Sequence, residues 1–306
     1  MTAAPASRAA AFREAMAPRL REWKYGIHRL RQSALAMIGL ALVVVYALVA
    51  LLAPVIAPPQ EFQTDPYEMP LDFRNDLKPP SPDHPFGTGV SGIDLFYGVV
   101  WGTRISIVMG LGVTIVGAVI GTILGGIAGY FGGKVDEAIM RLTDIFLAMP
   151  LLILAMGVAV ALGRGLFNIG LALAIVWWPS YTRLVRGQVL SIRENQYVEA
   201  ARAVGASDWR IITRHILPNT MSPIMVQATL DIGSVILISA ALSFIGFGPS
   251  GSNFAEWGNL VSQGQQFLLR AWWPVTIPGL AIFGFALGFN LLGDGLRDLL
   301  DPRLRK

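Results

Sequence analysis

The chain has 306 residues, of which 54% are hydrophobic and only 14% are charged. Soluble domains average about 25% charged residues, so this composition excludes a water-soluble protein and indicates an integral membrane protein. The absence of cysteine excludes disulfides, thiolate nucleophiles and cysteine-based metal sites. The three histidines lie far apart in the sequence and outside the apolar stretches, so neither a metal site nor a catalytic cluster is expected. Without a contiguous basic tract, nucleic acid is not an expected partner.

An apolar run of 25 residues follows a basic segment at the start of the chain. Residues 1–32 contain seven Lys and Arg against two Glu. The apolar run is too long for the core of a cleavable signal peptide and long enough to cross a bilayer. We predict a cytoplasmic N-terminal segment at 1–32 and a first transmembrane helix at 33–57.

The next segment, 58–103, is polar. It holds seven acidic residues against Arg74 and Lys78, and eight prolines lie between Pro58 and Pro85. Because proline fixes φ and cannot donate a backbone hydrogen bond, an extended conformation is expected in the first half. We predict an external loop at 58–103.

Five further apolar stretches define a core domain at 104–296. They predict transmembrane helices at 105–128, 144–162, 166–184, 223–247 and 274–296, with a short turn at 130–143, a proline-dependent kink at Pro150 and a cytoplasmic tail at 297–306. In the first of these stretches glycines recur every four residues, which places them on one helical face and permits close packing against another helix. These packing glycines are Gly117, Gly121, Gly125 and Gly129.

The distribution of positive charge predicts the orientation. With six spans and both termini cytoplasmic, 19 of the 24 Lys and Arg fall on the cytoplasmic side. This asymmetry agrees with the positive-inside rule, and the opposite orientation would invert it.

A polar, helix-forming island within 187–222 interrupts the apolar stretches. It contains Glu199-Ala200-Ala201-Arg202-Ala203-Val204-Gly205, then Ser207-Asp208 and, further on, Leu217-Pro218. Two short helices are predicted here. The first covers Glu194–Val204 and ends at Gly205, and the second is capped by Ser207 and ends near Pro218. A helix-turn-helix that projects from a membrane domain suggests a surface shaped for a partner.

The island resembles the signature cytoplasmic loop of permease subunits of ATP-binding cassette (ABC) importers: Glu-Ala-Ala, three residues, Gly and a closing Leu-Pro. The His-Ile-Leu-Pro-Asn at 215–219 and the Asp-Pro-Arg-Leu-Arg at 301–305 are similar to C-type subunits of the dipeptide, oligopeptide and nickel permease family. The outer motif at 86–94 also resembles that family, but Gly89 and Ile93 replace its usual Asp and Arg.

The resemblance implies an all-α membrane protein with the type I ABC importer permease fold. The implied fold has six transmembrane helices, a long external loop after the first helix and a cytoplasmic coupling helix-turn-helix. The implied location is the bacterial inner membrane. The implied partners are membrane lipid, a second homologous permease subunit, two ATP-binding subunits and an extracytoplasmic substrate-binding protein. ATP and magnesium would bind to the ATP-binding subunits, with no cofactor and no catalytic residue in this chain. The residues implied in ATPase coupling are Glu199, Ala200, Ala201, Gly205, Ser207, Asp208, Leu217 and Pro218.

Asp231 and Ser239 are candidates for the translocation pathway. Asp231 is the clearest acidic residue inside an apolar stretch, and such residues are often functional. Two structural alternatives remain: a hydrogen bond to a neighbouring helix, or hydration near the inner surface. Ser239 stands where the family commonly places a Glu.

The resemblance implies import of di- or oligopeptides, with a nickel chelate, glutathione or a sugar as alternatives. An ion-coupled secondary transporter would require several intramembrane carboxylates or paired broken helices. An intramembrane hydrolase would require a Ser/His, paired-Asp or metal-binding set within the spans. The sequence favours neither.

Overall fold

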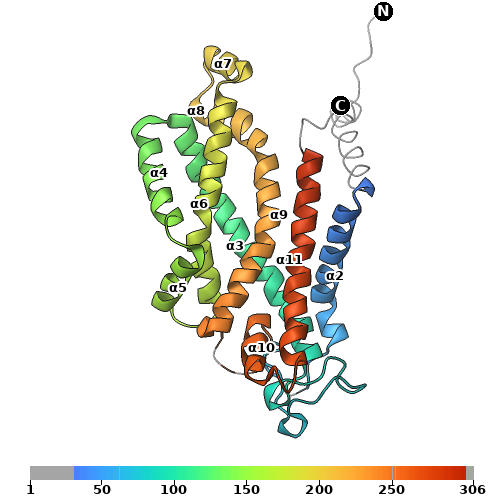
Figure 1. Cartoon of the computed structure of the whole chain (residues 1–306). Coiled ribbons are helices and arrows are strands. Elements are labelled where there is room, and N and C mark those ends of the chain that lie inside the picture. Colours follow the sequence, from blue (N-terminus) through green and yellow to red (C-terminus); the bar gives the residue numbers. More distant parts are fainter. Residues whose placement is uncertain (1–30, 62, 250, 252, 301–306) are drawn as a thin grey trace, which may run out of the picture.

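The computed structural model describes residues 31–61, 63–249, 251 and 253–300. These residues form a helical bundle, drawn in Figure 1. The α-helices are α2 (Ala34–Ile56), α3 (Leu95–Phe131), α4 (Gly133–Leu147), α5 (Leu151–Leu162), α6 (Leu166–Arg193), α7 (Gln196–Ala203), α8 (Asp208–Ile211), α9 (Leu217–Leu242), α10 (Trp257–Gly264) and α11 (Trp273–Leu300). Short 3-10 turns lie at Phe73–Asn75, Val90–Gly92 and Gln265–Phe267, and π-helical turns at Ile212–Ile216 and Ser243–Phe247.

Four helical stretches of the described chain are long and apolar enough to cross a membrane. They are Ala34–Ile56, Leu95–Phe131, Asp208–Phe247 and Trp273–Leu299, and the bent pair α4–α5 makes a fifth if it counts as one span. Helix α6 has 28 residues but is not among them, since its second half carries Ser, Tyr, Thr, Arg and Gln side chains. Length and composition therefore support four or five of the six predicted spans.

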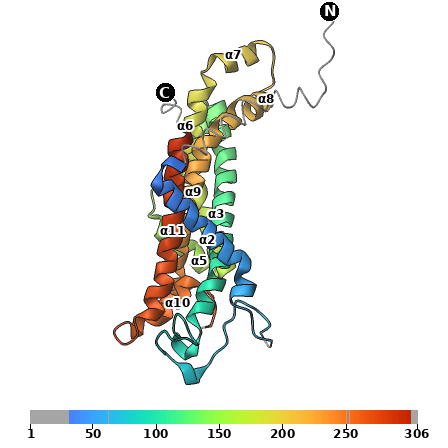
Figure 2. The ribbon, with the colours of Figure 1, turned by 90° about the vertical axis from the view of Figure 1, so that its right-hand side faces the viewer.

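Helices α3, α6 and α9 form the centre of the bundle. Helix α3 packs most extensively against α6, while α11 packs against α2 and α9. The start of α2 and the end of α11 lie at the same end of the molecule as α7 and α8 (Figures 1 and 2). Helix α10 and the long loop after α2 lie at the opposite end. The bundle thus carries a small helical hairpin at one end and an irregular layer at the other.

The four glycines spaced along α3 lie against α6. A Cβ added at Gly121 would come within 2.3 Å of Tyr181 Cβ and 2.6 Å of the Trp178 carbonyl oxygen. At Gly125 the nearest atom would be the Thr182 carbonyl oxygen, at 2.5 Å. Gly117 and Gly129 face Trp177 and Val189 in the same way. The absence of side chains along this face therefore allows the two helix backbones to approach closely.

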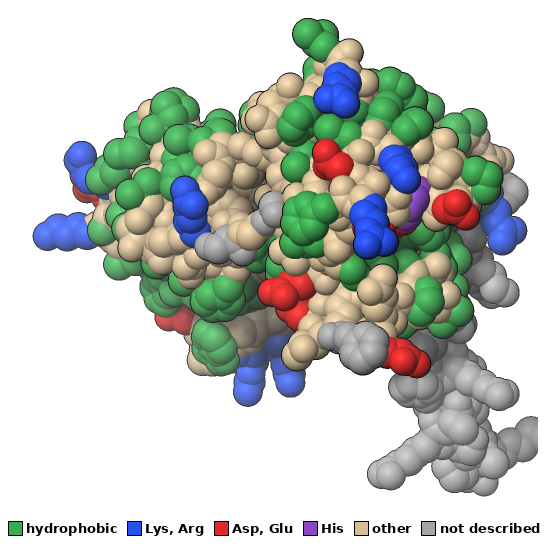
Figure 3. Space-filling model, turned by 90° about the horizontal axis from the view of Figure 1, so that it is seen from below, with side chains coloured by type: hydrophobic (Ala, Val, Ile, Leu, Met, Phe, Trp, Pro, Cys, Tyr) green, Lys and Arg blue, Asp and Glu red, His purple; other side chains and the backbone are tan. Residues whose placement is uncertain are grey.

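The irregular layer is held together by backbone and indole hydrogen bonds. The Met69 amide donates to the Asn253 carbonyl at 2.6 Å, which ties the loop after α2 to the segment before α10. The indoles of Trp101, Trp257 and Trp273 each donate to a backbone carbonyl at 2.9–3.1 Å. Both Trp257 and Trp273 are buried inside this layer. Figure 3 shows this end, where side chains of both charge signs are scattered among hydrophobic ones.

Two predicted connections are helical in part. Residues 95–103 belong to α3 rather than to the predicted loop at 58–103, because the Asp94 side chain accepts from the Tyr97 amide at 2.9 Å and caps the helix. The predicted turn at 130–143 is mostly α4. Gly132, with φ +66°, ends α3, and α4 then runs on the outside of α6, with Asp136 paired to Arg186.

The predicted third span, 144–162, is not one straight helix. Helices α4 and α5 meet at Pro150 with a bend of 91°, because proline cannot continue the helical hydrogen bonds. At the end of the chain, α11 continues to Leu300, so the predicted tail at 297–306 begins as helix. Residues 1–30 and 301–306 lie outside the described residues.

Candidate functional site

The hairpin predicted at the polar island is formed by α7 and α8. Helix α7 covers Gln196–Ala203, shorter than the predicted Glu194–Val204, and Gly205 follows with φ +79°. The Gly205 amide donates to the Arg202 carbonyl at 3.0 Å, and the Ala206 amide to the Ala201 carbonyl at 3.1 Å. These two bonds form a Schellman motif, which needs a left-handed residue at the position of Gly205.

The second half of the hairpin differs from its prediction. Ser207 is the N-cap residue of α8, but its hydroxyl makes no capping bond; its carbonyl accepts from the Ile211 amide at 3.0 Å. The helix does not end near Pro218. It passes through the π-turn Ile212–Ile216 directly into α9, whose first turn contains Pro218. Pro218 lies just after the π-turn, where the hydrogen-bond pattern of the helix changes, and it has no amide to donate.

The hairpin combines buried residues that anchor it in the bundle with an exposed tip. Val198, Ile211 and Ile216 are fully buried in the core formed by α3, α6 and α9. In contrast, Val204 is 84% exposed and Trp209 is 74% exposed. Of the predicted coupling residues, two are half-buried (Ala201, Leu217) and the others are exposed (Glu199, Ala200, Gly205, Ser207, Asp208, Pro218).

Polar contacts fasten the hairpin to the end of α3. The Tyr130 hydroxyl donates to Asp208 Oδ1 at 2.5 Å, and the Arg202 guanidinium lies 6.0 Å from the Tyr130 ring centroid. Arg193 Nη1 donates to the Gly129 carbonyl at 2.9 Å. Sequence reasoning missed these residues because partners 64 to 78 positions apart give no periodic signal.

Asp231 lies on the continuous helix that leads from the hairpin, and it lines a cavity of about 550 Å³. Its side chain is 7% exposed, and Oδ1 accepts from Gln227 Nε2 at 2.9 Å. The walls come from α9, from α6 and from the region where α4 and α5 bend. They include Phe146, Met149, Trp177, Ser180 and Ser234.

Ser239 is placed elsewhere. It is buried and lines a separate, small space of about 10 Å³ beside Ser106 and Glu256. The Glu256 carboxylate accepts from the amides of Gly258 and Asn259 at 3.0 and 2.7 Å and so caps α10. Burial raises the pKa of Glu256 above its ordinary value. The two predicted pathway residues therefore do not share one site, and the buried acid near Ser239, Glu256, was not among the predicted site residues.

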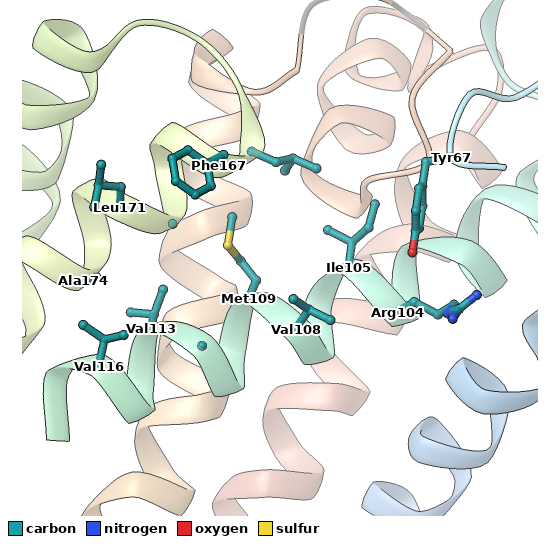
Figure 4. A pocket seen from close by; sticks show the side chains of 13 residues that line it. Tyr67, Arg104, Ile105, Val108, Met109, Val113, Val116, Phe167, Leu171 and Ala174 are labelled. Atoms are coloured by element: carbon teal, nitrogen blue, oxygen red, sulfur yellow. The ribbon is translucent and has the colours of Figure 1, made fainter. Parts of the chain in front are cut away.

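A third hollow, of about 500 Å³, is almost wholly apolar. Figure 4 shows Val108, Met109, Val113 and Phe167 in its walls, which belong to α3 and α6, while Arg104 and Tyr67 lie at one end. It offers surface for apolar contact but no cluster of functional groups. In the described chain, no group of three or more His, Asp or Glu side chains could hold a metal ion.

Comparisons with known proteins identify the family of the chain. A family model for the inner membrane component of binding-protein-dependent transport systems matches residues 121–306. The chain belongs to this family. A second model, for the N-terminal transmembrane domain of oligopeptide transport permease C, matches residues 22–80. The resemblance to C-type peptide permeases is confirmed, and this permease is a multi-pass inner membrane protein and not an enzyme.

Curated relatives cover nearly the whole permease. It is 46% identical over 274 residues to the probable D,D-dipeptide transport system permease protein DdpC of Escherichia coli, covering 90% of this chain and 89% of that one. It is 41% identical to the dipeptide transport system permease protein DppC of Alkalihalophilus pseudofirmus, covering 92% and 90%. The glutathione transport system permease protein GsiD of Escherichia coli is 40% identical, covering 92% and 91%.

Solved structures share the fold. An inward-facing conformation of the MetNI methionine ABC transporter aligns with a TM-score of 0.55 at 19% identity. The alignment covers 68% of the permease and 98% of that chain. The permease therefore shares the fold of that transporter chain.

Proposed function

We propose that this permease forms half of the translocation pathway of an ATP-driven importer of di- or oligopeptides, and that its α7–α8 hairpin receives the motion of a separate ATPase subunit. The observation that carries the proposal is the contrast within the hairpin. Its anchors Val198 and Ile211 are fully buried, while Val204 and Trp209 project into solvent at the tip.

An exposed apolar tip on a rigid support fits a docking surface. Large apolar side chains grouped at an exposed site commonly mark contacts with other proteins, and Trp is enriched where such contacts carry most energy. The Schellman turn at Gly205 and the Tyr130–Asp208 hydrogen bond hold the tip in place. Because α8 continues into α9, a displacement of the tip would tilt the helix that carries Asp231.

Charge supports a cytoplasmic position for the hairpin. Six arginines lie between Arg183 and Arg214, around the hairpin and at the adjoining end of α6. The positive-inside rule places such a segment in the cytoplasm, together with the start of α2 and the end of α11. In this orientation α6 and the α4–α5 pair complete six spans, and both termini are cytoplasmic.

The importer then requires other subunits. A second homologous permease subunit would supply the other half of the pathway, and two ATP-binding subunits would hold ATP and magnesium. An extracytoplasmic substrate-binding protein would dock on the layer built from the loop after α2 and the segment around α10. Peptides are the proposed cargo because relatives at 46% and 41% identity are named for dipeptide transport. Because another relative is named for glutathione transport, glutathione is the alternative cargo.

Cysteine cross-linking tests the docking. The chain has no cysteine, so Val204→Cys provides a single thiol at the tip. In a complex with its ATPase subunits, this variant should cross-link to a thiol placed on the ATPase. A Phe73→Cys control, with a 71% exposed side chain in the loop at the opposite end, should not. Cross-linking from Phe73→Cys alone would place the ATPase at the wrong end and refute the proposal.

Uptake assays test the energy source and the cargo. Proteoliposomes with the complete transporter and its binding protein should accumulate dialanine when ATP is enclosed, with or without a proton gradient. Uptake of glutathione but not of dialanine would favour the alternative cargo. Uptake driven by a proton gradient without ATP would refute the mechanism.

A further inference from the structure

The cavity beside Asp231 has the size of a small-molecule site. Its volume of about 550 Å³ lies within the range of roughly 300–1,000 Å³ that is typical of ligand pockets. It is lined mostly by apolar side chains with a few polar ones, Ser180 and Ser234 among them. This is the usual composition of a site that orients a small ligand through a few polar contacts.

Among the described residues that line this cavity, none carries a positive charge that could pair with the Asp231 carboxylate. Within the described chain, Asp231 Oδ2 has no hydrogen-bond partner, and only Oδ1 is bonded, to the neutral side chain of Gln227. The residues described as lining the cavity include no Lys, Arg or His. The neighbouring Tyr181 and Trp177 side chains offer hydrogen-bond donors but no positive charge. A buried carboxylate without a counter-ion is costly, so this oxygen favours a cationic ligand.

The surroundings distinguish between cations. Ca²⁺ or Mg²⁺ needs about six oxygen ligands, and the cavity provides a single carboxylate. An organic ammonium group needs fewer: it has three donors and is also attracted to aromatic faces, such as those of Trp177 and Phe146 in the cavity wall. Hydroxyl groups of Ser180 and Ser234 remain for other polar atoms of the same ligand.

We propose that Asp231 binds the protonated amino group of the cargo as it passes through this cavity. The inference rests on the proposed function, because a di- or oligopeptide carries such a group at its free N-terminus. Gln227 then acts as a positioning residue, since its amide holds Oδ1 and leaves Oδ2 for the cargo. The α4–α5 bend at Pro150 opens the space beside the carboxylate in which the rest of the peptide lies.

Thiol labelling measures the charge preference of the cavity directly. Because the chain has no cysteine, Ser180→Cys places one thiol in the cavity wall. A cationic methanethiosulfonate should react with it at least about tenfold faster than an anionic one of similar size, because a nearby carboxylate attracts the first reagent and repels the second. Adding Asp231→Asn should remove most of this preference. A neutral methanethiosulfonate should react equally fast in both variants, which checks that the cavity has kept its shape.

Protection by cargo completes the test in the assembled transporter. Dialanine should slow labelling of Ser180→Cys by the neutral reagent, whereas N-acetyl-dialanine, which has no ammonium group, should not. Asp231→Asn should abolish the protection. A charge preference that survives Asp231→Asn, or equal protection by both peptides, would overturn the inference even if dialanine is imported. Failure of the wild-type transporter to import dialanine would instead refute the proposed cargo, and the two failures are therefore distinguishable.

Discussion

The contact between α3 and α6 can be tested with a single methyl group. In Gly121→Ala the new Cβ would lie 2.3 Å from Tyr181 Cβ and 2.6 Å from the Trp178 carbonyl oxygen, whereas ordinary contact begins at 3.4 Å. Relief requires the two helices to separate by about 1 Å. Overpacking typically costs about 1–3 kcal/mol, and the upper value applies here because backbone atoms must move. The gain in helix propensity of about 1 kcal/mol leaves a net loss of about 2 kcal/mol.

Gly112→Ala is the matched control on the same helix. Nothing lies within 4 Å of a Cβ at that position, so only the propensity term remains and stability should not fall. For a loss of about 2 kcal/mol, thermal unfolding of the purified protein in detergent should shift down by roughly 4–8 °C for Gly121→Ala. Equal melting temperatures for Gly121→Ala and Gly112→Ala would show that the two helices are not held as closely as described, and would refute the packing argument.

Three further outcomes are expected. Gly205→Val forces a β-branched residue to φ +79°, which costs about 1–2 kcal/mol at the hairpin. The variant should reduce transport per ATP hydrolysed without lowering the melting temperature of the bundle. Gly205→Asn should have a smaller effect, because Asn tolerates this backbone conformation. Tyr130→Phe removes the hydrogen bond to Asp208, so hydrogen exchange of the α7–α8 amides should accelerate while that of the α9 amides stays unchanged. Equal exchange of the α7–α8 amides in the wild type and in Tyr130→Phe would contradict the role of this hydrogen bond in holding the hairpin. Burial raises the pKa of Glu256 above its value in the unfolded chain, so the contribution of Glu256 to stability is greatest at low pH. This contribution is lost as pH rises from the ordinary glutamate range toward the raised pKa. Glu256→Gln should therefore flatten that part of the profile of melting temperature against pH, and an unchanged slope would show that other groups cause the pH dependence.

Local chemistry made several features predictable. Gly205 has to adopt positive φ because the helix ends there, and the neighbouring residues are good helix formers. The four-residue glycine spacing on α3 indicated a packing face, and the apolar run at 33–57 coincides with α2 apart from its end residues. Each of these signals resides within one helix or one turn.

Other features depended on partners distant in the sequence. The helix was expected to stop near Pro218, but the π-turn before it and the burial of Ile211 and Ile216 among α3, α6 and α9 favour continuation. The buried acid beside Ser239 is Glu256. It is the N-cap residue of α10 and lies against α9. A periodic pattern of residues in the sequence does not indicate such contacts.

The sequence by itself determined that the chain is a membrane-embedded helical protein with a polar hairpin, because hydrophobicity, glycine spacing and charge asymmetry are properties of contiguous residues. Only the tertiary structure decided which helix the glycines face and where the chain bends at Pro150. It also decided that Asp231, but not Ser239, borders a cavity whose described lining holds no basic side chain. Those properties arise from the packing of α3, α6 and α9 against one another, and packing joins residues that the chain keeps far apart.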